Sequence, residues 1–119
     1  MKLKTTETAL VRSCLDFLAL KGIVAWRNNT QGVFDPVRGR FRTFTGRKGV
    51  SDILGIMPLG SRLAGRLIAV ECKIGRNVPS KEQHAFLADV KAHGGIALVV
   101  YSVDELIIAL NRILLKESD

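Results

Sequence analysis

The sequence predicts an α/β domain in which helices flank a mixed β-sheet, and three observations support this prediction. Its 119 residues are enough for one hydrophobic core, so we expect residues 1–119 to fold as a single domain. Amphipathic helical patterns alternate with short apolar runs of strand length. The run Leu67–Val70 is apolar at odd and even positions alike, which is typical of a strand buried on both faces.

The expected elements follow one another as helix, strand, basic hairpin, two paired strands, helix, strand and helix. Their ranges are 6–21, 23–27, 33–45, 51–57, 66–73, 80–92, 96–101 and 102–116. The first helix has an apolar stripe at helical spacing, with Thr5 or Thr6 as its cap and Gly22 just past its end. Residues 28–32 have the composition of a turn or loop, and a basic hairpin or a flexible flap is expected around Gly39.

The two later helices are predicted from their first residues. Ser80 and Gln83 have the spacing of a capping box, in which the cap and the third helical residue exchange side-chain hydrogen bonds. Ser102 and Glu105 have the same spacing. The apolar run 96–101 between these helices predicts a further strand.

The two paired strands are predicted to form an antiparallel hairpin. If its turn is centred between Ser61 and Arg62, Asp52 stands directly opposite Glu71, with their Cβ atoms roughly 5 Å apart. Two carboxyl groups that close repel each other unless a cation or a proton lies between them.

The chain is basic, with a net charge of +7 and a pI of about 9.9, which favours a polyanionic partner such as nucleic acid. Arginines alternate with Gly39 and Phe41 in the predicted hairpin, a pattern that suits phosphate contact and base stacking. The alternative is an exposed edge hairpin kept soluble by its charges. The candidate nucleic-acid contacts are Arg38, Arg40, Arg42, Arg47, Lys48 and Arg76.

The two cysteines, Cys14 and Cys72, are expected to be buried free thiols in a reducing compartment, because both fall in apolar patterns. The longest apolar runs are too short to span a bilayer. We therefore expect a cytoplasmic protein without a membrane partner.

Acidic residues and one lysine form a candidate metal site. Glu71 and Lys73 lie two positions apart on a strand, so their side chains share one face, where burial is costly unless they are paired or used. Glu7 lies on the apolar stripe of the first helix, either as a first-turn acid that favours the helix dipole or as an inward-facing ligand. With Asp52, these hard oxygen donors indicate Mg²⁺ or Mn²⁺ rather than zinc. The main-chain carbonyl of Cys72 is a further candidate ligand.

Asp52 followed by Glu71-Cys72-Lys73 resembles the PD-(D/E)xK nuclease motif, with Ser51 where the name of the motif has proline. Further matching features favour one family within this group. They are Glu7, the segment 49–55, Gln83 with Phe86, and His93-Gly94-Gly95. Together these residues resemble the VRR-NUC (virus-type replication-repair nuclease) family over nearly the whole chain, as a stand-alone domain of the kind found in phages and bacteria.

This resemblance implies a restriction-endonuclease-like core and Mg²⁺- or Mn²⁺-dependent cleavage of branched DNA, such as four-way junctions or flaps, by a homodimer. It also implies roles for single residues. Glu7, Asp52 and Glu71 would be metal ligands, Lys73 the catalytic lysine, and Gln83 a supporting residue, although the capping box alone also explains Gln83.

Two other functions remain open from the sequence. One is a non-catalytic nucleic-acid-binding module in which Glu71 and Lys73 form only an ion pair. The other is a nuclease that acts on plain duplex DNA, which the small size favours less because no extra segment is left for reading bases.

Overall fold

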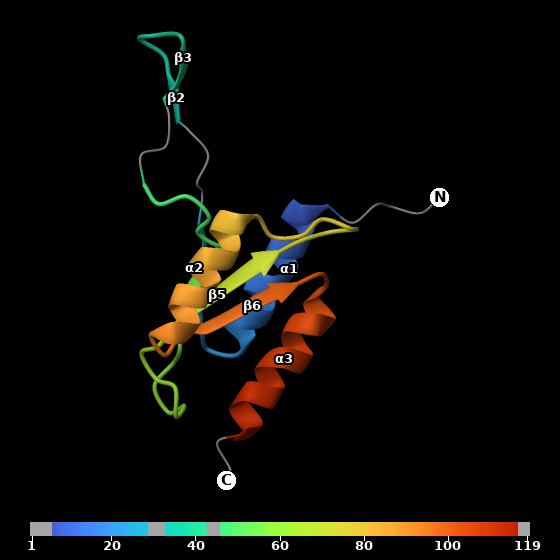
Figure 1. The fold of residues 1–119 in the computed structure, drawn as a ribbon. Helices are drawn as coiled ribbons and strands as arrows, with labels where there is room; N and C mark the ends of the chain where they lie inside the picture. The colour runs from blue at the N-terminus through green and yellow to red at the C-terminus, as the bar shows by residue number, and fades with distance from the viewer. Residues whose placement is uncertain (1–5, 29–32, 43–45, 117–119) are drawn as a thin grey trace, which may run out of the picture.

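The computed structural model describes residues 6–28, 33–42 and 46–116, and within these residues the chain forms three helices and six strands. Their bounds are α1 Glu7–Leu20, β1 Val24–Arg27, β2 Val33–Asp35, β3 Arg40–Arg42, β4 Ile53–Ile56, β5 Leu67–Cys72, α2 Lys81–Ala92, β6 Ile96–Val100 and α3 Val103–Leu115. The predicted α/β class is confirmed, and so is a mixed sheet flanked by helices (Figure 1).

The main sheet has four strands in the order β1-β4-β5-β6. The β1–β4 and β4–β5 pairs are antiparallel, and the β5–β6 pair is parallel. Helices α1 and α3 lie together on one face of this sheet, and α2 covers the β5–β6 half of the other face (Figure 1). The central strand β5 is therefore enclosed from both faces and both sides.

Strand β5 contributes to two apolar clusters because its side chains alternate between the faces of the sheet. Ile68, Val70 and Cys72 belong to the larger cluster, which includes residues of α1 and α3. Ala69 belongs to the smaller cluster under α2. Residues Ile68–Cys72 are all buried, as predicted for a strand covered on both faces. By the same alternation, Glu71 points to the α2 face.

The predicted register of the β4–β5 hairpin is confirmed. Ile53 pairs with Val70 and Leu54 with Ala69, the pairing expected for a turn centred between Ser61 and Arg62. The same register, continued by one position, places Asp52 opposite Glu71. Both strands are shorter than predicted, so Asp52 lies just before β4.

The caps of α1 agree with the prediction and select Thr6 over Thr5. The Thr6 hydroxyl accepts a hydrogen bond from the Ala9 N–H at 3.0 Å. At the other end, Gly22 has φ +77°, and the Ile23 N–H donates to the Leu18 carbonyl at 3.0 Å. This arrangement is a Schellman motif, and it turns the chain directly from α1 into β1.

Only one of the two predicted capping boxes is complete. In α2, the Ser80 hydroxyl accepts from the Gln83 N–H, and the Ser80 N–H donates to the Gln83 side chain at 2.8 Å. In α3, the Ser102 hydroxyl accepts from the Glu105 N–H, but the Glu105 carboxylate accepts from the N–H of Tyr101. The backbone of Ser102 is more extended than that of Ser80, with φ −156° instead of −70°. The N–H group that reaches the Glu105 carboxylate is therefore that of Tyr101 and not that of Ser102. The prediction of the second capping box is therefore confirmed for the bond to the Ser102 hydroxyl and wrong for the bond to the Glu105 side chain.

Strands β2 and β3 form the predicted hairpin, which is a separate two-stranded sheet. The Asp35 carboxylate closes the loop by accepting hydrogen bonds from the N–H groups of Val37 and Arg38, and Gly39 takes φ +65°. The hairpin stands away from the main sheet (Figure 1). The predicted turn at 29–32 and the predicted hairpin end at 43–45 lie outside the described residues.

No helix in the part of the chain that the structure describes combines the length and the apolar character needed to cross a membrane.

Candidate active site

Four predicted site residues meet at the end of the sheet where β4 begins and β5 ends. Glu7 is the first residue of α1, Asp52 precedes β4, Glu71 lies within β5, and Lys73 directly follows β5. The charges of Asp52, Lys73 and Glu7 all act on the carboxyl group of Glu71. Asp52 and Lys73 therefore lie beside Glu71, and Glu7 is near enough for its charge to act on the same carboxyl group.

Glu71 is the most constrained member of this group, because only 1% of its surface is exposed. Its pKa is raised to about 9, chiefly by burial and then by a hydrogen bond with Asp52 and by the charge of Asp52. The charge of Glu7 raises the pKa further, whereas Lys73 lowers it. Its Oε2 atom is buried and has no hydrogen-bond partner. A buried acceptor of this kind is rare in folded proteins and indicates a place for a proton or a cation.

The carboxylate of Asp52 is fixed by the neighbouring strand. Its Oδ2 accepts a hydrogen bond from the Cys72 N–H at 2.9 Å. Its main-chain carbonyl accepts from the Asn28 N–H at 2.7 Å, which continues the β1–β4 pairing by one step. Side chain and backbone of Asp52 are thus both held, so its carboxylate has little freedom to turn away from Glu71.

Lys73 shares the face of Glu71, as alternation along the strand predicted. Its N–H donates to the Val100 carbonyl at 3.0 Å, so the parallel pairing with β6 continues past the end of β5. The side chain is half-buried. This backbone bond holds the lysine at the edge of the carboxyl pair, where its charge favours ionised Glu71.

The donor set fits a hard divalent cation only in part. No three His, Cys, Asp or Glu side chains among residues 6–28, 33–42 and 46–116 are arranged so that they could hold a metal ion by themselves. Asp52 and Glu71 offer two carboxylates, and Mg²⁺ is commonly bound through one or two carboxylates together with water and substrate phosphate. The residues present therefore fit an ion of that kind, and Glu7 as a direct ligand remains a prediction.

Two predicted site residues have structural roles in the fold. Gln83 uses its side-chain oxygen in the capping box of α2, and its supporting role toward Lys73 stays a prediction. Cys72 has its thiol in the core, where a hydrogen bond with Cys14 and burial raise the pKa of the thiol. Both cysteines are free and buried, as expected. The Cys72 carbonyl as a metal ligand also stays a prediction.

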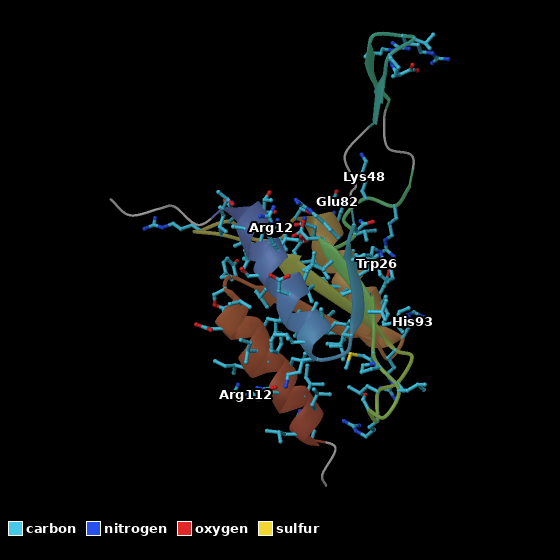
Figure 2. The ribbon with its side chains drawn as sticks, turned by 180° about the vertical axis from the view of Figure 1, so that it is seen from behind. Arg12, Trp26, Lys48, Glu82, His93 and Arg112 are labelled. Atoms are coloured by element: carbon cyan, nitrogen blue, oxygen red, sulfur yellow. The ribbon has the colours of Figure 1, made fainter. Side chains whose placement is uncertain are left out.

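The predicted nucleic-acid contacts lie at different places around the site. Arg38 and Arg40 are exposed on the hairpin, with the Arg38 guanidinium 3.8 Å from the Asp35 carboxylate. Lys48 extends from the loop before β4, beside the first turn of α2 (Figure 2). Arg76 is exposed in the loop that follows Lys73. The side chain of Arg42 lies outside the described part of the chain.

Arg47 differs from the other predicted contacts because it already has internal partners. Its guanidinium lies 2.7 Å from the Asp89 carboxylate and 5.2 Å from the centre of the Phe86 ring. It therefore fastens the loop after the hairpin to the outer surface of α2. No sequence pattern predicted this pairing, since the partners are 42 residues apart.

Gly49 fastens the same loop at a second point. Its φ is +86°, and a Cβ atom there would lie 2.4 Å from the main-chain carbonyl of Glu82. Only glycine allows the loop to approach the first turn of α2 so closely. Because Asp52 follows three residues later, this contact helps to set where Asp52 enters the site.

Comparisons with protein-family models, with curated proteins and with solved structures found no match, so the family resemblance of the motifs remains an expectation.

Proposed function

We propose that this protein is a Mg²⁺- or Mn²⁺-dependent nuclease that hydrolyses phosphodiester bonds in branched DNA. The main support is the carboxyl pair Asp52–Glu71, held together by the strand register, with a buried unpartnered oxygen on Glu71 and Lys73 on the same face. The net charge of +7 favours a polyanionic substrate.

In this proposal each residue has a distinct task. Asp52 and Glu71 provide hard oxygen ligands, and the Cys72 N–H keeps Asp52 oriented. A divalent ion bound there supplies a Lewis acid for a phosphate oxygen and lowers the pKa of an attacking water. Lys73 positions that water or stabilises the charge that develops on the phosphate. Glu7 adds negative charge that favours cation binding.

The preference for branched DNA is supported by the hairpin. It carries exposed Arg38 and Arg40 on a two-stranded sheet that stands off the main body (Figure 1). Cations at that distance can contact a second DNA arm while the carboxyl pair contacts the first. In a homodimer related by a twofold axis, two such sites would meet the two equivalent strands of a symmetric four-way junction.

One observation favours a second candidate function, a non-catalytic nucleic-acid-binding module. With a pKa raised to about 9, Glu71 is protonated at neutral pH in the metal-free protein and can share its proton with Asp52. The carboxyl pair would then be stable without a cation, and the basic residues would still bind DNA.

The deciding experiment is a cleavage assay on four-way junction, flap and plain duplex DNA, each with Mn²⁺, Mg²⁺ or EDTA. We expect cutting of branched DNA with either metal, none in EDTA, and none with Lys73→Ala. Arg12→Ala is the matched control, because it removes an exposed cation from the outer side of α1 (Figure 2).

Binding without cutting under all metal conditions would support the binding module instead. Cutting that persists in EDTA or in Lys73→Ala would contradict the proposed mechanism. Equal cutting of plain duplex would remove the preference for branched DNA.

A further inference from the structure

A basic hollow lies at the end of β5 opposite the carboxyl pair. Its volume is about 380 Å³, and it forms where β5 and β6 begin and where α2 and α3 end. Arg62, Arg66, Lys91 and Lys116 line it, together with the turn at Gly94 and apolar residues of β6 and α3. Among the residues that the structure describes, none of those lining the hollow is acidic.

The charges of this hollow favour an anion. The exposed cations Arg66, Lys91 and Lys116 around this hollow repel each other, and the repulsion is relieved when a phosphate or similar group binds among them. Lys91 and Lys116 are exposed, on α2 and directly after α3, so both can reach a ligand from opposite sides.

The guanidinium of Arg66 is partly held in position before any ligand binds. Its Nη1 donates to the Gly94 carbonyl at 3.4 Å, which ties the start of β5 to the turn after α2. Gly95 allows this close approach, since a Cβ atom there would lie 2.8 Å from the Leu67 carbonyl. Beside Gly94 there is open space, because a Cβ atom there would meet nothing within 4 Å.

The hollow is separate from the candidate active site. Arg66 and Glu71 are five positions apart along β5, which corresponds to about 17 Å at the rise of a strand. Base-pair steps in duplex DNA rise about 3.4 Å each, so this distance spans about five steps. A duplex that presents one phosphate to the carboxyl pair could therefore present another near the hollow.

We propose that this hollow is a second phosphate-binding site, which takes the sugar–phosphate backbone of nucleic acid away from the cleaved bond. The choice of nucleic acid as the source of the phosphate rests on the proposed function, whereas the preference for an anion rests on the cations Arg66, Lys91 and Lys116. Binding through phosphates predicts an affinity that does not depend on base sequence.

The test measures the binding of fluorescent four-way junction and duplex DNA in EDTA, so that no cutting is required. Lys91→Ala/Lys116→Ala removes two exposed cations of the hollow. Arg12→Ala/Arg112→Ala removes the same charge from the outer sides of α1 and α3 (Figure 2). We expect the first variant to lower affinity about tenfold and to reduce the salt slope by about one to two, and the control to change affinity less than twofold. Equal losses in both variants would overturn the proposal.

A second measurement distinguishes nucleic acid from small anions. In amide NMR spectra, the signals of Gly94 and Gly95 should shift when a short duplex is added at micromolar concentration. Shifts with inorganic phosphate at millimolar concentration but none with duplex would mean a small-anion site and would overturn the proposal.

These results are independent of whether the protein cuts DNA. If cutting is absent but Lys91→Ala/Lys116→Ala still weakens binding selectively, the second site stands and the nuclease proposal fails. If cutting is present and the two double variants bind equally, the nuclease proposal stands and the second site fails.

Discussion

The two ends of β5 carry opposite charges in opposite surroundings. At its C-terminal end, Glu71 is buried against Asp52, and burial dominates its chemistry. At its N-terminal end, Arg66 is exposed in a hollow lined by other cations. A buried carboxylate must be neutralised in place, by a proton or a metal ion. Exposed cations are stabilised by water and remain available for a ligand that binds from solution. In our proposals the first end therefore takes part in cleavage and the second in binding.

Substitutions in the carboxyl pair should have the greatest effect on the turnover number. Glu71→Gln or Asp52→Asn should lower the turnover number for cleavage about 10³-fold, because each removes a charged ligand while keeping the side-chain shape. DNA affinity measured in EDTA should stay within about twofold. Lys91→Ala/Lys116→Ala should show the reverse, a lower affinity with an unchanged turnover number at saturating DNA. A loss of turnover in that double variant would show that the basic hollow also takes part in the cleavage step.

Metal binding should stabilise only the acidic end. At a Mn²⁺ concentration one hundred times the dissociation constant, the free energy of unfolding should rise by about 2.7 kcal/mol, which is on the order of 10 °C in melting temperature. Glu71→Gln should remove this shift, and Arg12→Ala should retain it. Differential scanning fluorimetry with and without EDTA gives both values. If Mn²⁺ raised the melting temperature of Glu71→Gln as much as that of the unchanged protein, the ion would bind at another site.

The pH dependence of stability should report the buried acid directly. The pKa of Glu71 is raised from its ordinary value of 4.5 to about 9, so between these values the folded protein binds a proton that the unfolded chain has released. In the absence of metal, the contribution of Glu71 to the free energy of unfolding should therefore be greatest below about pH 5 and should fall as the pH rises toward 9. Urea unfolding in EDTA from pH 5 to 9 measures this fall, and Glu71→Gln should flatten it. An equal slope in both proteins would contradict the shift.

The hairpin should act as a third, purely electrostatic region. Arg38→Ala/Arg40→Ala should weaken DNA binding about tenfold at all base sequences and lower the salt dependence. The melting temperature should not change, because β2 and β3 pair only with each other. Fluorescence anisotropy at several salt concentrations tests this against Arg12→Ala/Arg112→Ala. Unchanged affinity would mean that the hairpin is only an exposed edge.

The smallest effect is expected at Arg47. Its ion pair with Asp89 and its contact with Phe86 are partly exposed, so Arg47→Ala should cost only about 1 kcal/mol of unfolding free energy. A double-mutant cycle with Asp89→Ala isolates the ion pair. A coupling near zero would show that the ion pair does not hold the loop, which would leave the Phe86 contact and Gly49 to do so.

Sequence patterns predicted the features that depend on local or periodic signals. The apolar run before Glu71 predicted a strand buried on both faces, and the turn centre at Ser61–Arg62 predicted the pairing that brings Asp52 to Glu71. The spacing of Ser80 and Gln83 predicted a capping box. In each case a few neighbouring residues determine the geometry.

Features that depend on distant parts of the chain were missed. The basic hollow joins the beginnings of two strands to the ends of two helices, and no spacing in the sequence brings Arg66 near Lys116. The ion pair that attaches Arg47 to α2 likewise joins residues far apart in the sequence. For Glu105 the cap itself was predicted, but the partner of its carboxylate was predicted wrongly, because Ser102 has a different backbone dihedral angle from Ser80.

The register of the β4–β5 hairpin also has an evolutionary consequence. The connection between these strands runs from Met57 to Arg66 at the end far from the carboxyl pair, so homologous chains can lengthen or shorten it without moving Asp52 relative to Glu71. A single deletion inside β4 or β5 is different, because it would turn one of the two carboxyl groups to the opposite face. Insertions and deletions in relatives should therefore accumulate in this connection, and the spacing from Asp52 to Ile56 and from Leu67 to Glu71 should stay fixed.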